Sequence, residues 1–82
     1  MDKAKEIEKL AKRIKSLRIE KGYSSYENFA FDKGIPRAQY GRYETGTDIQ
    51  YTSLLKLVKA FDMSLEEFFK KDFWCANVGV NW

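Results

Sequence analysis

Glycine interrupts the helical patterns of this chain at Gly22, Gly34 and Gly46, each time where an apolar periodicity stops. Over residues 4–21 the apolar side chains recur three or four positions apart, at Ile7, Leu10, Ala11, Ile14 and Leu17. This spacing predicts one amphipathic helix with Lys and Glu on its other face. Glycine is the residue most often found directly after a helix. The chain is therefore expected to fold as several short helices joined by tight connections.

A second helix is predicted to follow Gly22. Ser24 stands three positions before Glu27, the spacing of a capping box, in which a serine and a glutamate bind the free N–H groups of a first turn. The helix should run to about Lys33 and end at Gly34. Its inward-facing residues are predicted to be Tyr26, Phe29 and Ala30.

A third helix is predicted over residues 38–44. Ile35 and Pro36 begin this element, since proline suits a first helical turn, where its missing N–H costs nothing. Tyr40 and Tyr43 are three positions apart and should share the inner face. The pattern places two short helices on either side of a turn at residues 34–36.

Two further helices complete an all-α chain of five helices. The fourth has an i, i+1, i+4, i+7 apolar pattern, and a second capping box opens the fifth, which carries two phenylalanines. The residues concerned are Leu54, Leu55, Val58 and Phe61, then Ser64, Glu67, Phe68 and Phe69. We expect one helix-turn-helix domain over residues 1–71, with the motif at about 25–44, and a short non-helical aromatic tail over 72–82.

Composition excludes several classes of function. A chain of 82 residues is one domain with a thin core, which makes a dimer plausible. There is no histidine, and the single cysteine, Cys75, cannot form an internal disulfide, so no metal site and no cofactor are expected. No acid–base or nucleophilic constellation forms, which argues against an enzyme. No apolar run is long enough to span a membrane, and a cytoplasmic protein is expected.

Positive charge is concentrated away from the two middle helices. Residues 1–21 carry eight Lys or Arg against four Asp or Glu, whereas residues 22–50 carry three against four. The segment with the helix-turn-helix spacing is therefore slightly acidic. A role in binding nucleic acid has to explain this balance.

The order of these signals along most of the chain resembles that of the phage repressor and Cro type of helix-turn-helix domain, the XRE family. The resemblance covers residues 14–69, and no single motif is decisive. The matching residues are Leu17-Arg18, Phe29-Ala30, Gly34-Ile35, Tyr40, Arg42-Tyr43-Glu44 with Gly46, Leu54-Leu55, Leu57-Val58, Ala60-Phe61 and Met63 to Phe69. The first residue of the second helix is usually glutamine in this family, and here it is Tyr26.

The resemblance implies that the third helix, about residues 37–43, enters the major groove of double-stranded DNA. Its base-contacting residues would be Arg37, Ala38, Gln39, Gly41 and Arg42. Arginine suits guanine O6 and N7 through two parallel hydrogen bonds, and alanine can touch a thymine methyl. Gln39 would reach a base or a phosphate.

Phosphate contact and a structural brace are also implied by the resemblance. The phosphate-contacting residues would be Ser25, Tyr26, Thr45 and Thr47, together with nearby backbone N–H groups. Arg18, late in the first helix, would pair with Glu44, which closes the third helix. A buried pair would neutralise Glu44 and so make residues 22–50 less acidic toward a partner.

Two functions remain open on the sequence. The first is a sequence-specific transcriptional regulator that represses as a homodimer on a two-fold operator. The second is a protein-interaction module that keeps the fold without binding DNA, such as the antitoxin of a toxin–antitoxin pair. The near-neutral charge of residues 22–50 and the aromatic tail motivate this alternative.

Overall fold

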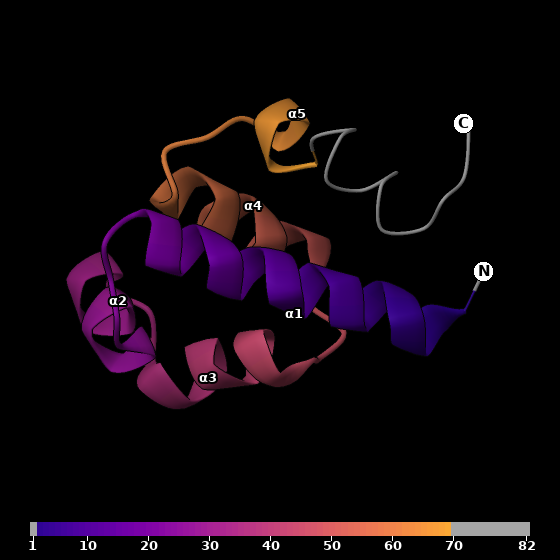
Figure 1. Cartoon of the computed structure of the whole chain (residues 1–82), viewed down its shortest axis with the longest axis horizontal. Helices are drawn as coiled ribbons and strands as arrows, with labels where there is room; N and C mark the ends of the chain where they lie inside the picture. The colour runs from indigo at the N-terminus through magenta and orange to yellow at the C-terminus, as the bar shows by residue number, and fades with distance from the viewer. Residues whose placement is uncertain (1, 70–82) are drawn as a thin grey trace. The chain divides into compact units, whose positions relative to one another are not determined.

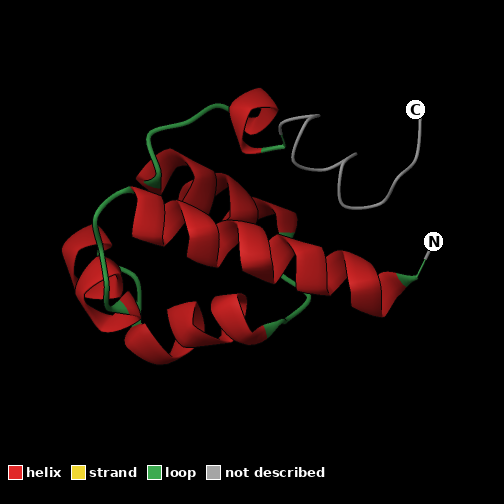
Figure 2. Ribbon diagram, viewed as in Figure 1, coloured by secondary structure: helices red, strands yellow, loops and turns green. Residues whose placement is uncertain are grey.

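The computed structural model describes residues 2–69, and within that range the chain forms five helices and no strand (Figures 1 and 2). The helices are α1 (Lys3–Glu20), α2 (Tyr26–Lys33), α3 (Arg37–Thr45), α4 (Tyr51–Ala60) and α5 (Leu65–Phe68). The predicted all-α class is confirmed. The chain divides after Gln50 into two compact units, of which the first contains α1, α2 and α3. The predicted aromatic tail, residues 72–82, lies outside the described residues.

The first helix begins at a side-chain cap. The carboxylate of Asp2 accepts hydrogen bonds from the backbone N–H groups of Ala4, at 3.0 Å, and Lys5, at 3.4 Å. These bonds satisfy N–H groups that have no partner inside the helix, and the negative charge suits the helix N-terminus. Along α1 the predicted inner face is buried at Ala11, Ile14 and Leu17, and partly buried at its N-terminal end.

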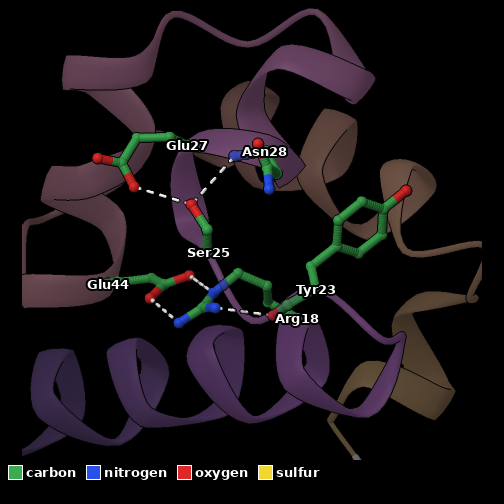
Figure 3. Close-up of polar contacts among 6 residues, drawn as sticks. All are labelled: Arg18, Tyr23, Ser25, Glu27, Asn28 and Glu44. Carbon is green, nitrogen blue, oxygen red and sulfur yellow. Dashed lines mark hydrogen bonds and ion pairs between the residues drawn. The ribbon is translucent and has the colours of Figure 1, made fainter.

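The cap of α2 differs from the predicted one. Ser25, not Ser24, is the N-cap residue, with extended backbone angles, and its hydroxyl accepts from the N–H of Asn28 at 3.4 Å. Glu27 is therefore only two positions after the cap, too close for its carboxylate to bind the backbone N–H of Ser25. Its carboxylate instead accepts from the Ser25 hydroxyl at 2.9 Å (Figure 3). The capping box predicted from Ser24 and Glu27 is wrong by one residue.

The turn between α2 and α3 depends on a left-handed glycine. Gly34 has φ 70° and ψ 30°, a conformation that glycine adopts without steric penalty. The N–H of Ile35 donates to the carbonyl of Ala30 at 2.9 Å, and that of Gly34 donates to Phe31 at 3.3 Å, which together form a Schellman motif. Pro36 then lies one residue before α3. The prediction that it belongs to the first turn of this helix is wrong by one position.

Aromatic side chains hold α2 and α3 together. Tyr40 is fully buried, and its ring lies 5.1 Å from that of Phe29, 6.3 Å from that of Tyr43 and 6.4 Å from that of Tyr26. Offset and edge-on ring pairs at these separations add to the hydrophobic gain of burial. The predicted inward placement of Tyr40 and Tyr43 is confirmed, as both are buried.

In the second unit, α4 buries a slightly different face from the predicted one. Leu54, Val58 and Phe61 are buried as expected, but Leu55 is 38% exposed and Leu57 only 1% exposed. The buried set thus follows the i, i+3, i+4, i+7 spacing that a helical period of 3.6 residues requires. The capping box of α5 is confirmed, with the Ser64 N–H donating to the Glu67 carboxylate at 2.9 Å.

Asp62, two positions after the end of α4, has φ 61° and is the one non-glycine residue with positive φ in the part of the chain that the structure describes. Asp62→Gly is expected to raise the free energy of unfolding by up to about 1 kcal/mol, because glycine has no Cβ clash there. Asp62→Val is expected to lower it by about as much, since β-branched residues rarely adopt this conformation. Urea unfolding measures both effects.

The variant Asp62→Asn separates the backbone effect from that of charge. Asparagine tolerates the left-handed conformation but removes the carboxylate from the C-terminal end of α4. If valine proved as stable as glycine at this position, the backbone explanation would be wrong.

Candidate nucleic-acid interface

The candidate interface is built on α2, the turn at residues 34–36 and α3. Within the first unit, α3 packs against both α1 and α2 (Figure 1). Its inner side is fixed by two buried tyrosines, Tyr40 and Tyr43. One long side of α3 is therefore buried, and the other is available for a partner.

The outward side of α3 carries two arginines. Arg37, Ala38, Arg42 and Thr45 are all exposed, and at 100° per residue they fall on one side of the helix. Neither arginine forms an ion pair with any residue between positions 2 and 69. Three of the residues predicted to contact bases, Arg37, Ala38 and Arg42, thus lie together on the accessible face.

Arg18 and Glu44 form a buried ion pair between α1 and α3. The Nε of Arg18 donates to one carboxylate oxygen of Glu44 at 2.7 Å, and one terminal nitrogen donates to the other oxygen at 3.1 Å (Figure 3). The remaining terminal nitrogen donates to the backbone carbonyl of Tyr23 at 2.8 Å. The two side chains are only 6% and 8% exposed. The hydrogen bonds to Glu44 raise the pKa of Arg18 and keep it charged.

This pair removes an acidic group from the accessible side of α3. The Glu44 carboxylate is engaged at both oxygens by one guanidinium, so its negative charge is compensated locally. The exposed side chains of α3 then include two positive charges and no unpaired negative one. Local charge at this surface is positive, although the segment as a whole is slightly acidic.

The hydroxyl of Tyr40 lies next to this ion pair. It is buried and makes no hydrogen bond within residues 2–69. Burial raises the pKa of Tyr40 well above its ordinary value of 10.0, and the nearby Glu44 carboxylate raises it further while Arg18 acts in the opposite direction. The phenol is therefore neutral at neutral pH.

Gln39 and Gly41 are placed differently from the three exposed residues. Both are half-buried. The side-chain amide of Gln39 donates to the Tyr43 hydroxyl, one turn further along α3. A Cβ added at Gly41 would lie 3.1 Å from Cε1 of Tyr26, so this glycine faces α2. Gly41 thus lies at the contact between the two helices.

The residues predicted to hold phosphate differ in exposure. Ser25 and Tyr26, at the start of α2, are half-buried, as is Thr47. Thr45 is exposed, and its hydroxyl donates to the carbonyl of Arg42 at 3.2 Å. The Ser25 hydroxyl is already engaged as the cap of α2.

Tyr23 has a role that the sequence did not indicate. Its carbonyl accepts from Arg18, its ring lies edge-on to Phe29 at 5.1 Å, and its hydroxyl donates to Asp32. The bond to Asp32 raises the pKa of Tyr23. No local pattern signals these contacts, because they join segments that meet only in the folded chain.

Comparison with known proteins matches residues 14–68 to a family described as helix-turn-helix. The matched range begins in the second half of α1 and ends at the last residue of α5. Neither the curated proteins nor the solved structures contain a match. Of the helices within residues 2–69, none has the length and hydropathy needed to cross a membrane.

Breaking the Arg18–Glu44 pair is expected to destabilise the fold strongly. Glu44→Ala should lower the free energy of unfolding by about 3–5 kcal/mol, because it leaves a buried guanidinium without its partner. Arg18→Lys keeps the charge but cannot form the two-pronged contact, so it should also lose stability. Chemical denaturation measures both.

The matched control is Asp48→Ala, which breaks the exposed pair of Asp48 with Lys3, whose side chains are 71% and 78% exposed. Exposed pairs contribute little, so no measurable change is expected. Equal effects of Glu44→Ala and Asp48→Ala would contradict the importance of the buried pair.

Tyr40→Phe is expected to raise the free energy of unfolding by about 1 kcal/mol at pH 7, since it removes a buried hydroxyl without a partner. Because burial raises the pKa of Tyr40 in the folded state, the unfolded chain releases this proton first, and the folded state loses stability as the pH rises above 10.0, the ordinary pKa. The variant should therefore resist alkaline unfolding better than the wild type. Urea unfolding between neutral and strongly alkaline pH tests this, and a less stable Tyr40→Phe at pH 7 would contradict it.

Proposed function

The chain belongs to the XRE-type helix-turn-helix family of DNA-binding transcriptional regulators, and from this premise we propose that it is a sequence-specific repressor. In this proposal it binds double-stranded DNA as a homodimer, with α3 as the recognition helix in the major groove. The observation that carries the proposal is the exposed side of α3. It presents Arg37 and Arg42 without ion-pair partners in the described part of the chain, while Glu44 is bound by Arg18.

Arg37 and Arg42 are proposed to contact bases. They are five positions apart on one side of α3, so both guanidinium groups can enter the same groove. Each can donate two parallel hydrogen bonds to O6 and N7 of a guanine. Ala38 lies on the same exposed side and offers a methyl group to a thymine. The proposed preference is therefore for sites that contain guanine and thymine at fixed spacing.

Gln39 and Gly41 have more restricted roles in this proposal. With one amide N–H directed at Tyr43, Gln39 keeps its second N–H and its carbonyl oxygen for a base or a phosphate. Gly41 could offer only backbone atoms to the DNA, because Tyr26 occupies the space of a side chain at this position.

Phosphate groups are proposed to bind on both flanks of α3. At the start of α2, the backbone N–H groups of Tyr26 and Glu27 have no acceptor within residues 2–69 and carry the partial positive charge of a helix N-terminus. Thr47 would supply a hydroxyl donor on the other flank, as would Thr45 if its hydroxyl turned away from the Arg42 carbonyl. Because few cations contact phosphate, the affinity should depend only weakly on salt concentration.

The proposed dimer follows from the thin core of a small chain and from the symmetry of operators that such domains bind. Two copies of α3 would enter successive major grooves about 34 Å apart. Selection from random double-stranded DNA is therefore expected to recover a palindrome. Comparing the full chain with one ending at residue 71 tests whether the proposed domain boundary is correct.

Arg37→Ala and Arg42→Ala test the proposed base contacts. Each is expected to weaken binding to the selected site by about 1–3 kcal/mol and to relax the preference at one base position. Lys15→Ala is the matched control, because it removes an exposed positive charge from α1. If no sequence is enriched by the full chain, or if Lys15→Ala has the same effect as the two arginine variants, specific reading by α3 is ruled out.

Glu27→Gln tests the phosphate site proposed at the start of α2. The Glu27 carboxylate lies beside the Ser25 cap at this helix end, where it would repel a phosphate. The variant is expected to bind both specific and random DNA more tightly at low salt, with the difference shrinking as salt is added. An unchanged affinity at low salt would place the phosphate elsewhere.

A second candidate function, a protein-interaction module such as an antitoxin, is favoured by one observation. Phe31 on α2 is 90% exposed, far more than is usual for a phenylalanine in a folded domain. A stoichiometric protein partner that is lost in Phe31→Ser, together with no DNA binding at low salt, would favour this function over the first.

A further inference from the structure

The contact between Tyr26 and Gly41 has no explanation in local helix formation. Gly41 lies inside α3 with ordinary helical backbone angles, since it is absent from the residues with positive φ. Glycine in a helix interior destabilises the helix by about 1 kcal/mol relative to alanine. The left-handed conformation that explains Gly34 therefore cannot explain Gly41. Some other requirement must favour glycine here.

Space is that requirement. A Cβ on residue 41 would lie 3.1 Å from Cε1, 3.5 Å from Cζ and 3.6 Å from the hydroxyl oxygen of Tyr26. The shortest of these distances is below an ordinary carbon–carbon contact, so a side chain would push the ring or the helix away. The edge of the Tyr26 ring is thus packed directly against the backbone of α3.

The ring cannot easily move aside to make room. It is stacked on the ring of Tyr40 at 6.4 Å with an interplanar angle of 28°. Tyr40 is itself fully buried and packed against Phe29 at 5.1 Å. Displacing Tyr26 would therefore disturb the aromatic contacts that join α2 to α3, so the added volume would be relieved partly by a shift of α3.

Such a shift would reach both proposed base-contacting arginines. Arg37 is one helical turn before Gly41, and Arg42 directly follows it. Hydrogen bonds to base edges lose strength within a few tenths of an ångström beyond about 3.2 Å. Attraction between positive side chains and phosphates changes little over the same distance. A displaced α3 would therefore lose discrimination between sequences while keeping most of its general attraction to DNA.

We propose that Tyr26 is a positioning residue for α3, and that the absence of a side chain at Gly41 sets how closely α3 approaches α2 and hence how deeply its arginines reach into the groove. This inference rests on the proposed function. It gives Tyr26 a task that depends on its ring and is separate from the phosphate contact proposed for its backbone N–H. It also explains why residue 41 is glycine by the lack of space for a side chain, and not by the backbone conformation.

The test compares affinities for the selected site and for random DNA, using the full chain. Gly41→Ala is expected to lower the ratio of these affinities by about tenfold. Its thermal stability should stay near that of the wild type, because the gain in helix propensity from alanine offsets the strain of the added methyl group. Loss of specificity without loss of stability is a result that a merely structural role for Gly41 would not give.

Two variants of Tyr26 separate the ring from the hydroxyl. Tyr26→Phe keeps both the ring and the backbone N–H, and it is expected to keep the affinity ratio. In the double variant Tyr26→Ala with Gly41→Ala, the smaller residue 26 makes room for the new methyl group, so the loss should be smaller than the sum of the single effects. In the free protein, the ring current of Tyr26 should shift the Gly41 Hα resonances in the NMR spectrum, and the Tyr26→Ala variant should abolish that shift.

The outcomes distinguish the two proposals. If the wild type enriches no sequence, the proposed function fails, and the positioning role fails with it. If the wild type enriches a site but Gly41→Ala keeps the full affinity ratio, only the positioning role is overturned. If Gly41→Ala does not fold, Tyr26→Ala against Tyr26→Phe decides, because an equal affinity ratio in these two variants would also overturn it.

Discussion

The guanidinium of Arg18 donates to three oxygens, two on Glu44 and one on the backbone at Tyr23, and so joins α1, the connection to α2 and the end of α3. Burying two charges costs free energy, which geometry of this quality can offset because both carboxylate oxygens are bound. The contact also decides the electrostatics of α3, since it compensates the negative charge of Glu44. A lysine at position 18 could not form the two-pronged contact and would leave part of that charge uncompensated.

Around this pair, aromatic rings determine how α3 is held. Tyr40 packs against Phe29, Tyr26 and Tyr43, and its buried hydroxyl lies beside the ion pair without a hydrogen bond of its own in the described chain. A stable core would not need that hydroxyl. The rings fix one side of α3 against α2, and the ion pair fixes its end against α1. Its other side remains free to present Arg37 and Arg42.

Sequence reasoning predicted the elements well where the signal is local. The five helices, the end at Gly34 and the cap at Ser64 follow from periodicity and from hydrogen bonds between near neighbours. It was wrong by one or two residues where nearby side chains compete for the same role. Ser24 and Ser25 are both good caps, and only the path of the backbone after α1 selects the second. Leu55 and Leu57 are equally apolar, and only the helical period separates the exposed from the buried one.

By itself, the sequence determined the class of fold, the position of the helix-turn-helix segment and the presence of two arginines on one side of its second helix, because these depend on the order and spacing of residues. Only the tertiary structure decided which of the residues around those arginines are engaged by other side chains. It showed that Glu44 is bound at both oxygens, that Gln39 is tied to Tyr43, and that Gly41 packs against Tyr26. These contacts join residues on different helices or turns, and their distances follow from packing, which no local pattern specifies.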